Sequence, residues 1–159
     1  MKKTFKLLAM LFALAVLFAV FIACRGITDT ENIIRITVGD NGAIQAVIKY
    51  GEPIDIAGEH QTIGQVLDAL VAGNPDITFE YDGTADSDWG RFLRVLGDLR
   101  PVTANNEFIA VFLTYPAPSS HSTLPAIEVD SVTFYSANAG IDQLPVLNGI
   151  TYLFAISTF

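Results

Sequence analysis

The sequence predicts an α+β fold in which a single helix covers one face of a mixed β-sheet. Three observations support this prediction. Apolar runs of strand length are separated by turn residues, one segment carries apolar residues at helical spacing, and the 159 residues are close to the length of one domain. The chain contains no internal repeat, and no linker divides residues 33–159. We therefore expect one folded domain there.

The first two strands are expected to form a hairpin. Ile33–Val38 and Ala43–Tyr50 are apolar runs, and the Asn41–Gly42 pair between them favours a tight turn. A short strand is expected at Ile54–Ile56. The helix should follow soon after it.

The predicted helix has a start signal, an apolar stripe and a stop signal. Thr62 is a suitable N-cap and Gln65 stands three positions later, as in a capping box. The sequence Gly73-Asn74-Pro75 is expected to end the helix. The residues of the stripe are Ile63, Val66, Leu67, Leu70 and Val71.

Only strands are expected after the helix. They are predicted at Ile77–Tyr81, Arg91–Leu96, Glu107–Tyr115, Ile127–Tyr135 and Thr151–Ser157. A hairpin, one helix and then further strands is the element order of a β-grasp. We therefore expect a β-grasp-like mixed sheet packed on one helix.

Residues 1–23 have the features of a lipoprotein signal peptide. Three lysines among the first six residues precede a charge-free apolar run, which ends directly before Cys24, the one cysteine of the chain. The sequence Phe21-Ile22-Ala23-Cys24 resembles a bacterial lipobox. This resemblance implies lipid on Cys24 and a short tether over 24–32 that holds the domain at the extracytoplasmic face of the cell membrane. An uncleaved transmembrane helix and simple secretion are the alternatives.

Charge and cysteine content argue against several classes of protein. Lys and Arg number 9 against 17 Asp and Glu, and without the three lysines of the leader the balance is 6 − 17 = −11. Such an acidic surface repels phosphate backbones, so no nucleic acid partner is expected. With Cys24 acylated, no thiol remains for a disulfide, a metal ligand or a nucleophile. No cofactor is expected.

Four segments together resemble a known family. They are Gln61–Leu70, Ile77–Tyr81, Asp88–Leu99 and Asn148–Phe154. They are similar, in sequence and in order, to exported bacterial domains related to the C-terminal domain of transcobalamin. The resemblance implies a β-grasp module, often lipid-anchored, that binds a ligand rather than catalysing a reaction. Because the vertebrate relatives cap cobalamin, it also implies a corrinoid-like ligand.

The candidate ligand-binding residues are Trp89, Arg91 and Tyr115. Trp89 stands between Asp88 and Gly90 at the entrance of a strand, where an exposed indole ring could stack on a ligand. Arg91, Arg94 and Arg100 lie within ten positions of one another. They could form an anion-binding face, or they could pair with nearby carboxylates.

The segment 82–88 carries oxygen-bearing side chains at alternate positions, as calcium loops do. Asp82, Asp86 and Asp88 are the candidate metal ligands. The segment lacks the glycine and the glutamate of an EF-hand. A solvated acidic turn is the alternative interpretation.

Catalytic motifs are absent from the sequence. His60 and His121 lie far apart, and neither belongs to a motif for metal binding or nucleophilic catalysis. The segment Ser119–Ser122 is a candidate binding loop. We therefore expect a membrane-anchored extracellular lipoprotein that acts as a binding module and not as an enzyme. The alternative is a structural or adhesive surface module that contacts protein or glycan.

Overall fold

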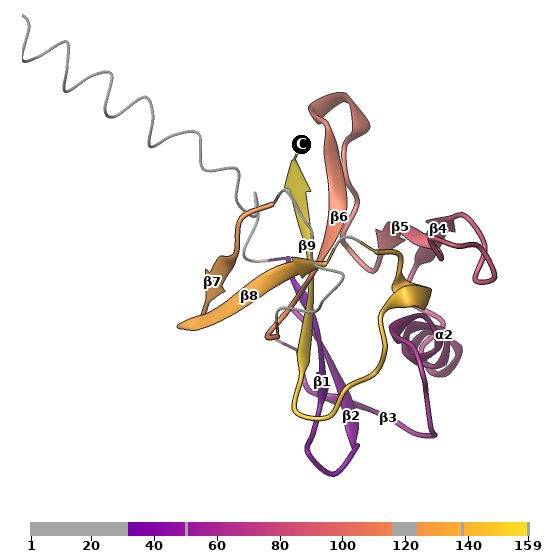
Figure 1. Ribbon diagram of the computed structural model, residues 1–159. Coiled ribbons are helices and arrows are strands. Elements are labelled where there is room, and N and C mark those ends of the chain that lie inside the picture. The colour runs from indigo at the N-terminus through magenta and orange to yellow at the C-terminus, as the bar shows by residue number, and fades with distance from the viewer. Residues whose placement is uncertain (1–31, 50, 116–123, 138, 159) are drawn as a thin grey trace, which may run out of the picture.

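The computed structural model describes residues 32–49, 51–115, 124–137 and 139–158, and within them the chain has the expected α+β composition. The strands are β1 (Ile34–Val38), β2 (Ile44–Ile48), β3 (Ile54–Ile56), β4 (Phe79–Asp82), β5 (Phe92–Leu96), β6 (Glu107–Leu113), β7 (Ile127–Val129), β8 (Val132–Ala137) and β9 (Thr151–Thr158). The α-helix is α2 (Ile63–Gly73), and two short 3-10 helices are η1 (Thr103–Asn105) and η2 (Ile141–Gln143). Figure 1 shows α2 and the β4–β5 hairpin together on one side of the long strands.

The large sheet is antiparallel, not mixed as the sequence predicted. Its order is β3-β2-β1-β9-β6-β8-β7, and every neighbouring pair in it is antiparallel. The expectation failed because β9 runs antiparallel to both strands that flank it, β1 and β6. Strands β4 and β5 form a separate two-stranded hairpin.

One predicted strand is in fact a hairpin. The segment predicted as a single strand, 127–135, contains β7, a turn and most of β8. The turn residues Asp130 and Ser131 both have positive φ, 52° and 63°, as a two-residue type I′ turn requires. Asn-Gly and Asp-Gly pairs signal this turn, and Asp-Ser does so only weakly. The other predicted strands and the first hairpin are present, with ends shifted by at most two residues.

The predicted helix and its caps are confirmed. The Thr62 hydroxyl accepts a hydrogen bond from the Gln65 N–H at 3.4 Å, and the Gln65 side chain accepts one from the Gln61 N–H at 2.7 Å. At the other end, the Asn74 side chain donates to the Leu70 carbonyl at 2.8 Å. These contacts satisfy groups that the ends of a helix leave unpaired. No helix in the described residues is long and apolar enough to cross a membrane.

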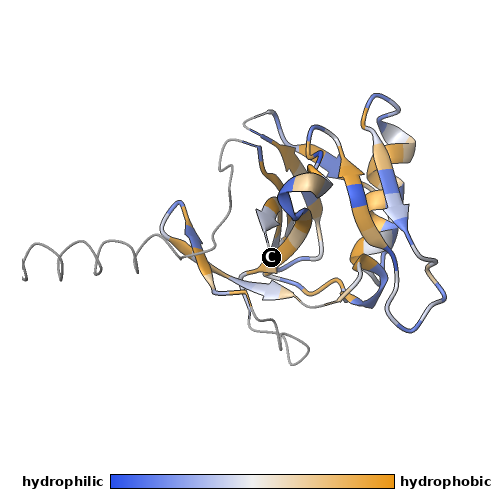
Figure 2. Ribbon diagram, turned by 90° about the horizontal axis from the view of Figure 1, so that it is seen from above, coloured by the Kyte–Doolittle hydropathy of each residue, from blue (hydrophilic) through white to orange (hydrophobic). Residues whose placement is uncertain are grey.

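The core lies on both faces of the large sheet. Along β6, Ile109, Val111 and Leu113 belong to the cluster that α2 covers, whereas Ala110 and Phe112 belong to a smaller cluster on the opposite face. This alternation follows from the two-residue period of a strand. Figure 2 shows apolar residues concentrated on the strands and hydrophilic residues on the turns. The elements α2, β4–β5 and η2 form a layer that covers one face of the large sheet, and the candidate site lies in this covering layer.

Candidate functional site

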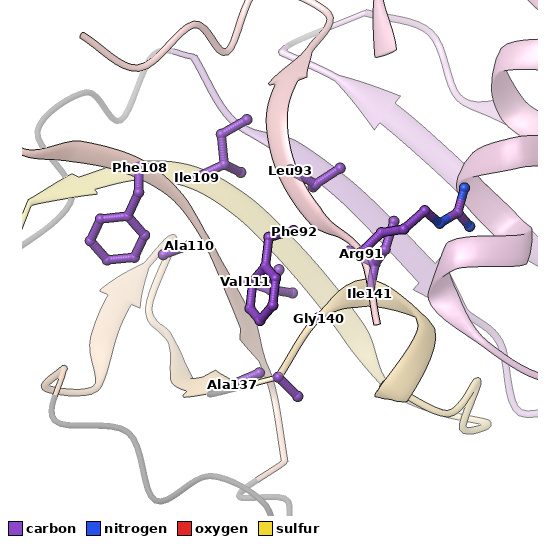
Figure 3. A pocket seen from close by; sticks show the side chains of 11 residues that line it. Arg91, Phe92, Leu93, Phe108, Ile109, Ala110, Val111, Ala137, Gly140 and Ile141 are labelled. Carbon is purple, nitrogen blue, oxygen red and sulfur yellow. The ribbon is translucent and has the colours of Figure 1, made fainter. Parts of the chain in front are cut away.

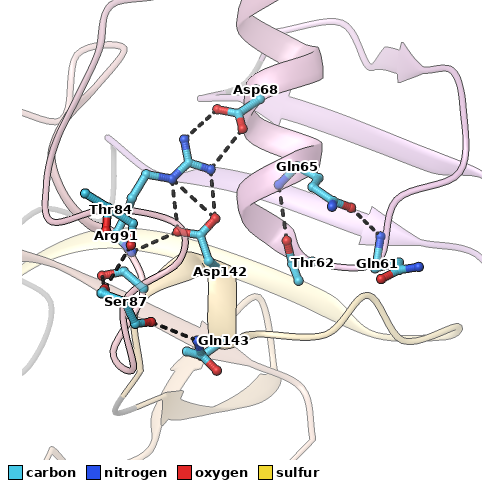
Figure 4. Close-up of polar contacts among 10 residues, drawn as sticks. Gln61, Thr62, Gln65, Asp68, Thr84, Ser87, Arg91, Asp142 and Gln143 are labelled. Atoms are coloured by element: carbon cyan, nitrogen blue, oxygen red, sulfur yellow. Dashed lines mark hydrogen bonds and ion pairs between the residues drawn. The ribbon is translucent and has the colours of Figure 1, made fainter.

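A buried arginine joins three elements where β5 begins. The guanidinium of Arg91 donates to Asp68 of α2 over 2.7 and 2.9 Å. It also donates to Asp142 of η2, with Nε 2.9 Å from Oδ2 and Nη2 2.8 Å from Oδ1. The Arg91 backbone N–H donates to Asp142 Oδ2 over 2.8 Å. We call Arg91, Asp68 and Asp142 the arginine cluster; Figure 4 shows its bonds.

The arginine cluster is shielded from water on its Asp142 side. The side chains of Arg91 and Asp142 are 7% and 8% exposed, and that of Asp68 is 50% exposed. The pKa of Asp142 is lowered, chiefly by its hydrogen bonds from Arg91. The pKa of Arg91 is raised, first by its hydrogen bonds to Asp142 and then by those to Asp68. The charges are therefore satisfied within the protein.

Aromatic rings and glycines complete the surroundings of the arginine. The centre of the guanidinium lies 4.8 Å from the ring centroid of Tyr81 and 5.8 Å from that of Phe79, within the range of cation–π attraction. A side chain at Gly64 would meet Asp142 and would lie 2.8 Å from Arg91 Nη2. At Gly140 it would lie 2.7 Å from the Arg91 carbonyl oxygen. The close packing of α2 and of the segment before η2 against Arg91 therefore requires that both positions lack a side chain.

An apolar groove of about 320 Å³ lies on the other side of Arg91. Three segments line it: residues 91–93 at the start of β5, residues 108–111 of β6, and residues 137 and 139–141 from the end of β8 to the start of η2. We call it the β5–β6 groove. Figure 3 shows the rings of Phe92 and Phe108 beside small side chains, Ala110 and Ala137 among them, while the guanidinium of Arg91 points away toward the helix.

The groove forms where the covering layer ends. Strand β8 pairs with β6 only from Val111 to Leu113, and beyond Ala137 the chain crosses to β5 instead. There the Gly140 and Ile141 N–H groups donate to the Trp89 and Arg91 carbonyls over 3.0 and 2.9 Å. The divergence of β8 from β6 leaves a space with alanine and glycine on its walls, and nothing in the described residues fills it.

The structure separates the three predicted ligand-binding residues. Arg91 lines the groove, but its charged end is engaged in the arginine cluster. Trp89 is 68% exposed and Tyr115 is 50% exposed, and neither lines the groove. Sequence reasoning missed Phe92 and Phe108 as wall residues, because an aromatic residue in a strand usually belongs to the core. Phe92 is 49% exposed, and this exposure depends on how the covering layer packs on the large sheet, so the sequence does not predict it.

Arg94 and Arg100, the other two arginines of the predicted anion-binding face, also have partners. Arg94 pairs with Asp82 at 3.4 Å, and Arg100 donates to the Thr78 hydroxyl at 3.1 Å. Both line a second hollow of about 430 Å³, which also contains Glu80 and Glu107. The charges of this hollow are therefore mixed.

The predicted metal ligands are not brought together. Asp82, Asp86 and Asp88 form no group of three carboxylates that could hold an ion, and no such group occurs elsewhere in the described part of the chain. Asp82 faces Arg94 across the β4–β5 hairpin instead. His60 lies in a loop with its Nε2 3.2 Å from the Ala57 carbonyl oxygen. The leader, Cys24, His121 and the segment 119–122 lie outside the described residues.

Comparisons with known proteins give no relative. No protein-family profile, curated protein or solved structure matches this chain.

Proposed function

We propose that this protein is a binding module held at the extracytoplasmic face of the cell membrane by lipid on Cys24, and that its ligand occupies the β5–β6 groove. The observation that carries the proposal is the groove itself. It offers about 320 Å³ of open apolar space beside a half-exposed aromatic ring, Phe92. Concave apolar pockets with few polar groups are the usual form of a ligand site.

The chemistry of the groove supports binding rather than catalysis. Apart from Arg91, its lining side chains are apolar, and the guanidinium of Arg91 is turned toward two carboxylates. The groove therefore supplies contact area to a ligand and no group poised to move a proton. The ligand should carry an uncharged apolar group, because a charge placed there would lose its hydration without gaining a partner.

The proposed relation to β-grasp domains of the transcobalamin type also favours a binding role. A corrin macrocycle is larger than this groove, so a corrinoid could insert only a peripheral apolar substituent. A corrinoid therefore belongs among the test ligands.

The proposal is tested with the full chain in phosphatidylcholine nanodiscs, with alanine methyl groups labelled for NMR. Benzene and cyanocobalamin are titrated separately. We expect benzene to shift the methyl resonances of Ala110 and Ala137 saturably, because both line the groove. Phe92→Ala should weaken this binding at least fivefold. Tyr115→Ala removes a similarly exposed ring outside the groove lining and should leave it unchanged. Absence of any saturable shift with either ligand contradicts the proposal.

A second candidate function, an adhesive module that contacts glycan, is favoured by the exposure of Trp89. Its indole ring is 68% exposed beside the loop 82–88, and sugar rings stack on such surfaces. Trp89→Ala should abolish adhesion to a glycan surface while leaving benzene binding intact. Equal adhesion by this variant would contradict the glycan function.

A further inference from the structure

The backbone of β6 has an unpaired edge in the wall of the groove. Thr114 N–H donates to the Thr151 carbonyl over 3.1 Å, and β6 and β9 keep one register from Glu107 to Leu113. Hydrogen-bonded pairs alternate along an antiparallel ladder. The N–H and C=O groups of residues 108, 110 and 112 therefore point to β9, and those of residues 109, 111 and 113 point to the opposite edge.

Strand β8 occupies only part of that opposite edge. It pairs with residues 111 to 113 and then leaves β6. Within the described ranges, no backbone group pairs with the outward-pointing N–H and C=O of Ile109. Ile109 is only 7% exposed and lines the groove. The backbone groups of a residue so little exposed ordinarily have a hydrogen-bond partner, and burying them without one costs free energy.

The unpaired edge and the apolar space lie side by side, which is the arrangement that an extended peptide matches. A peptide brings both a C=O and an N–H to the strand edge, and one of its side chains can enter an adjoining pocket. A hydrocarbon fills the pocket but leaves the Ile109 groups unpaired. The methyl group of Ala137 and the lack of a side chain at Gly140 leave room for the entering side chain.

Charge beside the groove indicates what should flank that side chain. The loop before β5 is attached to the groove wall, since the N–H of Gly140, which lines the groove, donates to the Trp89 carbonyl over 3.0 Å. Asp86 and Asp88 in this loop are exposed, and neither forms an ion pair with another described residue. The whole chain carries a net charge of −8. A basic segment is therefore attracted to this edge, and an acidic one is repelled.

We infer that the β5–β6 groove binds an extended segment of a partner protein, in which an apolar side chain flanked by basic residues enters the groove while the peptide backbone pairs with Ile109. This inference rests on the proposed function, because it names the ligand class of the same groove. The partner adds a short strand to β6 at the position that β8 vacates.

The test uses the full chain in phosphatidylcholine nanodiscs and fluorescein-labelled pentapeptides, with anisotropy as the readout and empty nanodiscs as the blank. The probe is KVFVK, acetylated and amidated. Its comparators are EVFVE and a KVFVK peptide with N-methyl groups on both valine amides and on the phenylalanine amide. We expect KVFVK to bind at least tenfold more tightly than either comparator. The double variant Asp86→Asn and Asp88→Asn should reduce KVFVK affinity at least threefold, whereas Asp76→Asn, an exposed aspartate after α2, should leave it unchanged.

The possible outcomes separate this inference from the function on which it rests. If N-methylation leaves KVFVK affinity within twofold, the backbone pairing is wrong. If EVFVE binds as tightly as KVFVK, the basic character of the partner is wrong. If no peptide binds while benzene shifts the Ala110 and Ala137 methyl groups, the peptide inference fails and the binding function stands. If none of the peptides, benzene and cyanocobalamin binds, both fail.

Discussion

The two sides of Arg91 differ in almost every physical property. On the helix side, the guanidinium of Arg91 is buried, charged and hydrogen-bonded to the carboxylates of Asp68 and Asp142. On the other side, the β5–β6 groove is apolar and unfilled, and among the described residues no backbone group pairs with the outward-pointing N–H and C=O of Ile109 in its wall. One residue borders both. The contrast shows how a strand can stabilise a fold through one side while leaving the other open to a partner.

The difference also explains why Arg91, a basic residue near an exposed tryptophan, has few donors left for an anionic ligand. A guanidinium with most of its donors already bonded to carboxylates offers little to an anion. To bind one, Arg91 would have to leave Asp142, and a buried carboxylate would then lack its partner. Arg91 therefore serves stability, and the groove is the site at which we propose binding.

The largest effect should follow from breaking the arginine cluster. Asp142→Asn removes a charge that is 8% exposed and should lower the free energy of unfolding by about 3 kcal/mol, the lower end for a broken buried ion pair, because Asp68 remains. The matched control is Asp82→Asn, whose 3.4 Å pair with Arg94 is exposed; it should cost less than about 1 kcal/mol. Urea unfolding at pH 7 measures both. Equal effects would remove the distinction between the two ion pairs.

A smaller loss is expected from crowding the arginine cluster. Gly64→Ala places a methyl group against Asp142 and Arg91 and should cost about 1–3 kcal/mol. Gly73→Ala in the same helix meets no atom within 4 Å and should stabilise the protein by up to about 1 kcal/mol. Thermal melts of the two variants give the comparison. A stable Gly64→Ala protein would show that the fit around Asp142 is loose.

The smallest expected effect is the dependence of stability on pH. It should be absent near neutrality and appear only in acid. Because the pKa of Asp142 is lowered in the folded state, the stability it contributes is complete above its ordinary value of 3.8 and is lost as pH falls toward the folded pKa. The stability gap between the wild type and Asp142→Asn should therefore narrow between pH 5 and pH 2.5. Urea unfolding at several pH values measures this gap. A gap that stays constant would mean that Asp142 does not titrate with folding.

Local features of the fold were predictable because their causes lie within a few residues. The side chains of Thr62 and Gln65 accept hydrogen bonds from backbone N–H groups within four residues at the start of α2. Asn41–Gly42 suits the turn between β1 and β2. The Asp130–Ser131 turn was missed because these residues accept positive φ only when the pairing of β7 with β8 requires it. The antiparallel direction of β9 was missed for a related reason, since strand direction depends on partners distant in sequence.

The candidate site lay beyond local reasoning. Arg91 and Asp142 are separated by 51 positions, and no spacing rule connects them. The groove exists because β8 leaves β6 at Ala137 and the chain crosses to β5. No local sequence pattern predicts this crossing. Length, charge, capping and apolar periodicity act through near neighbours and could be inferred from the amino-acid order. Which charges pair, which ring stays exposed and where space remains depend on how distant elements pack, so only the folded chain decided them.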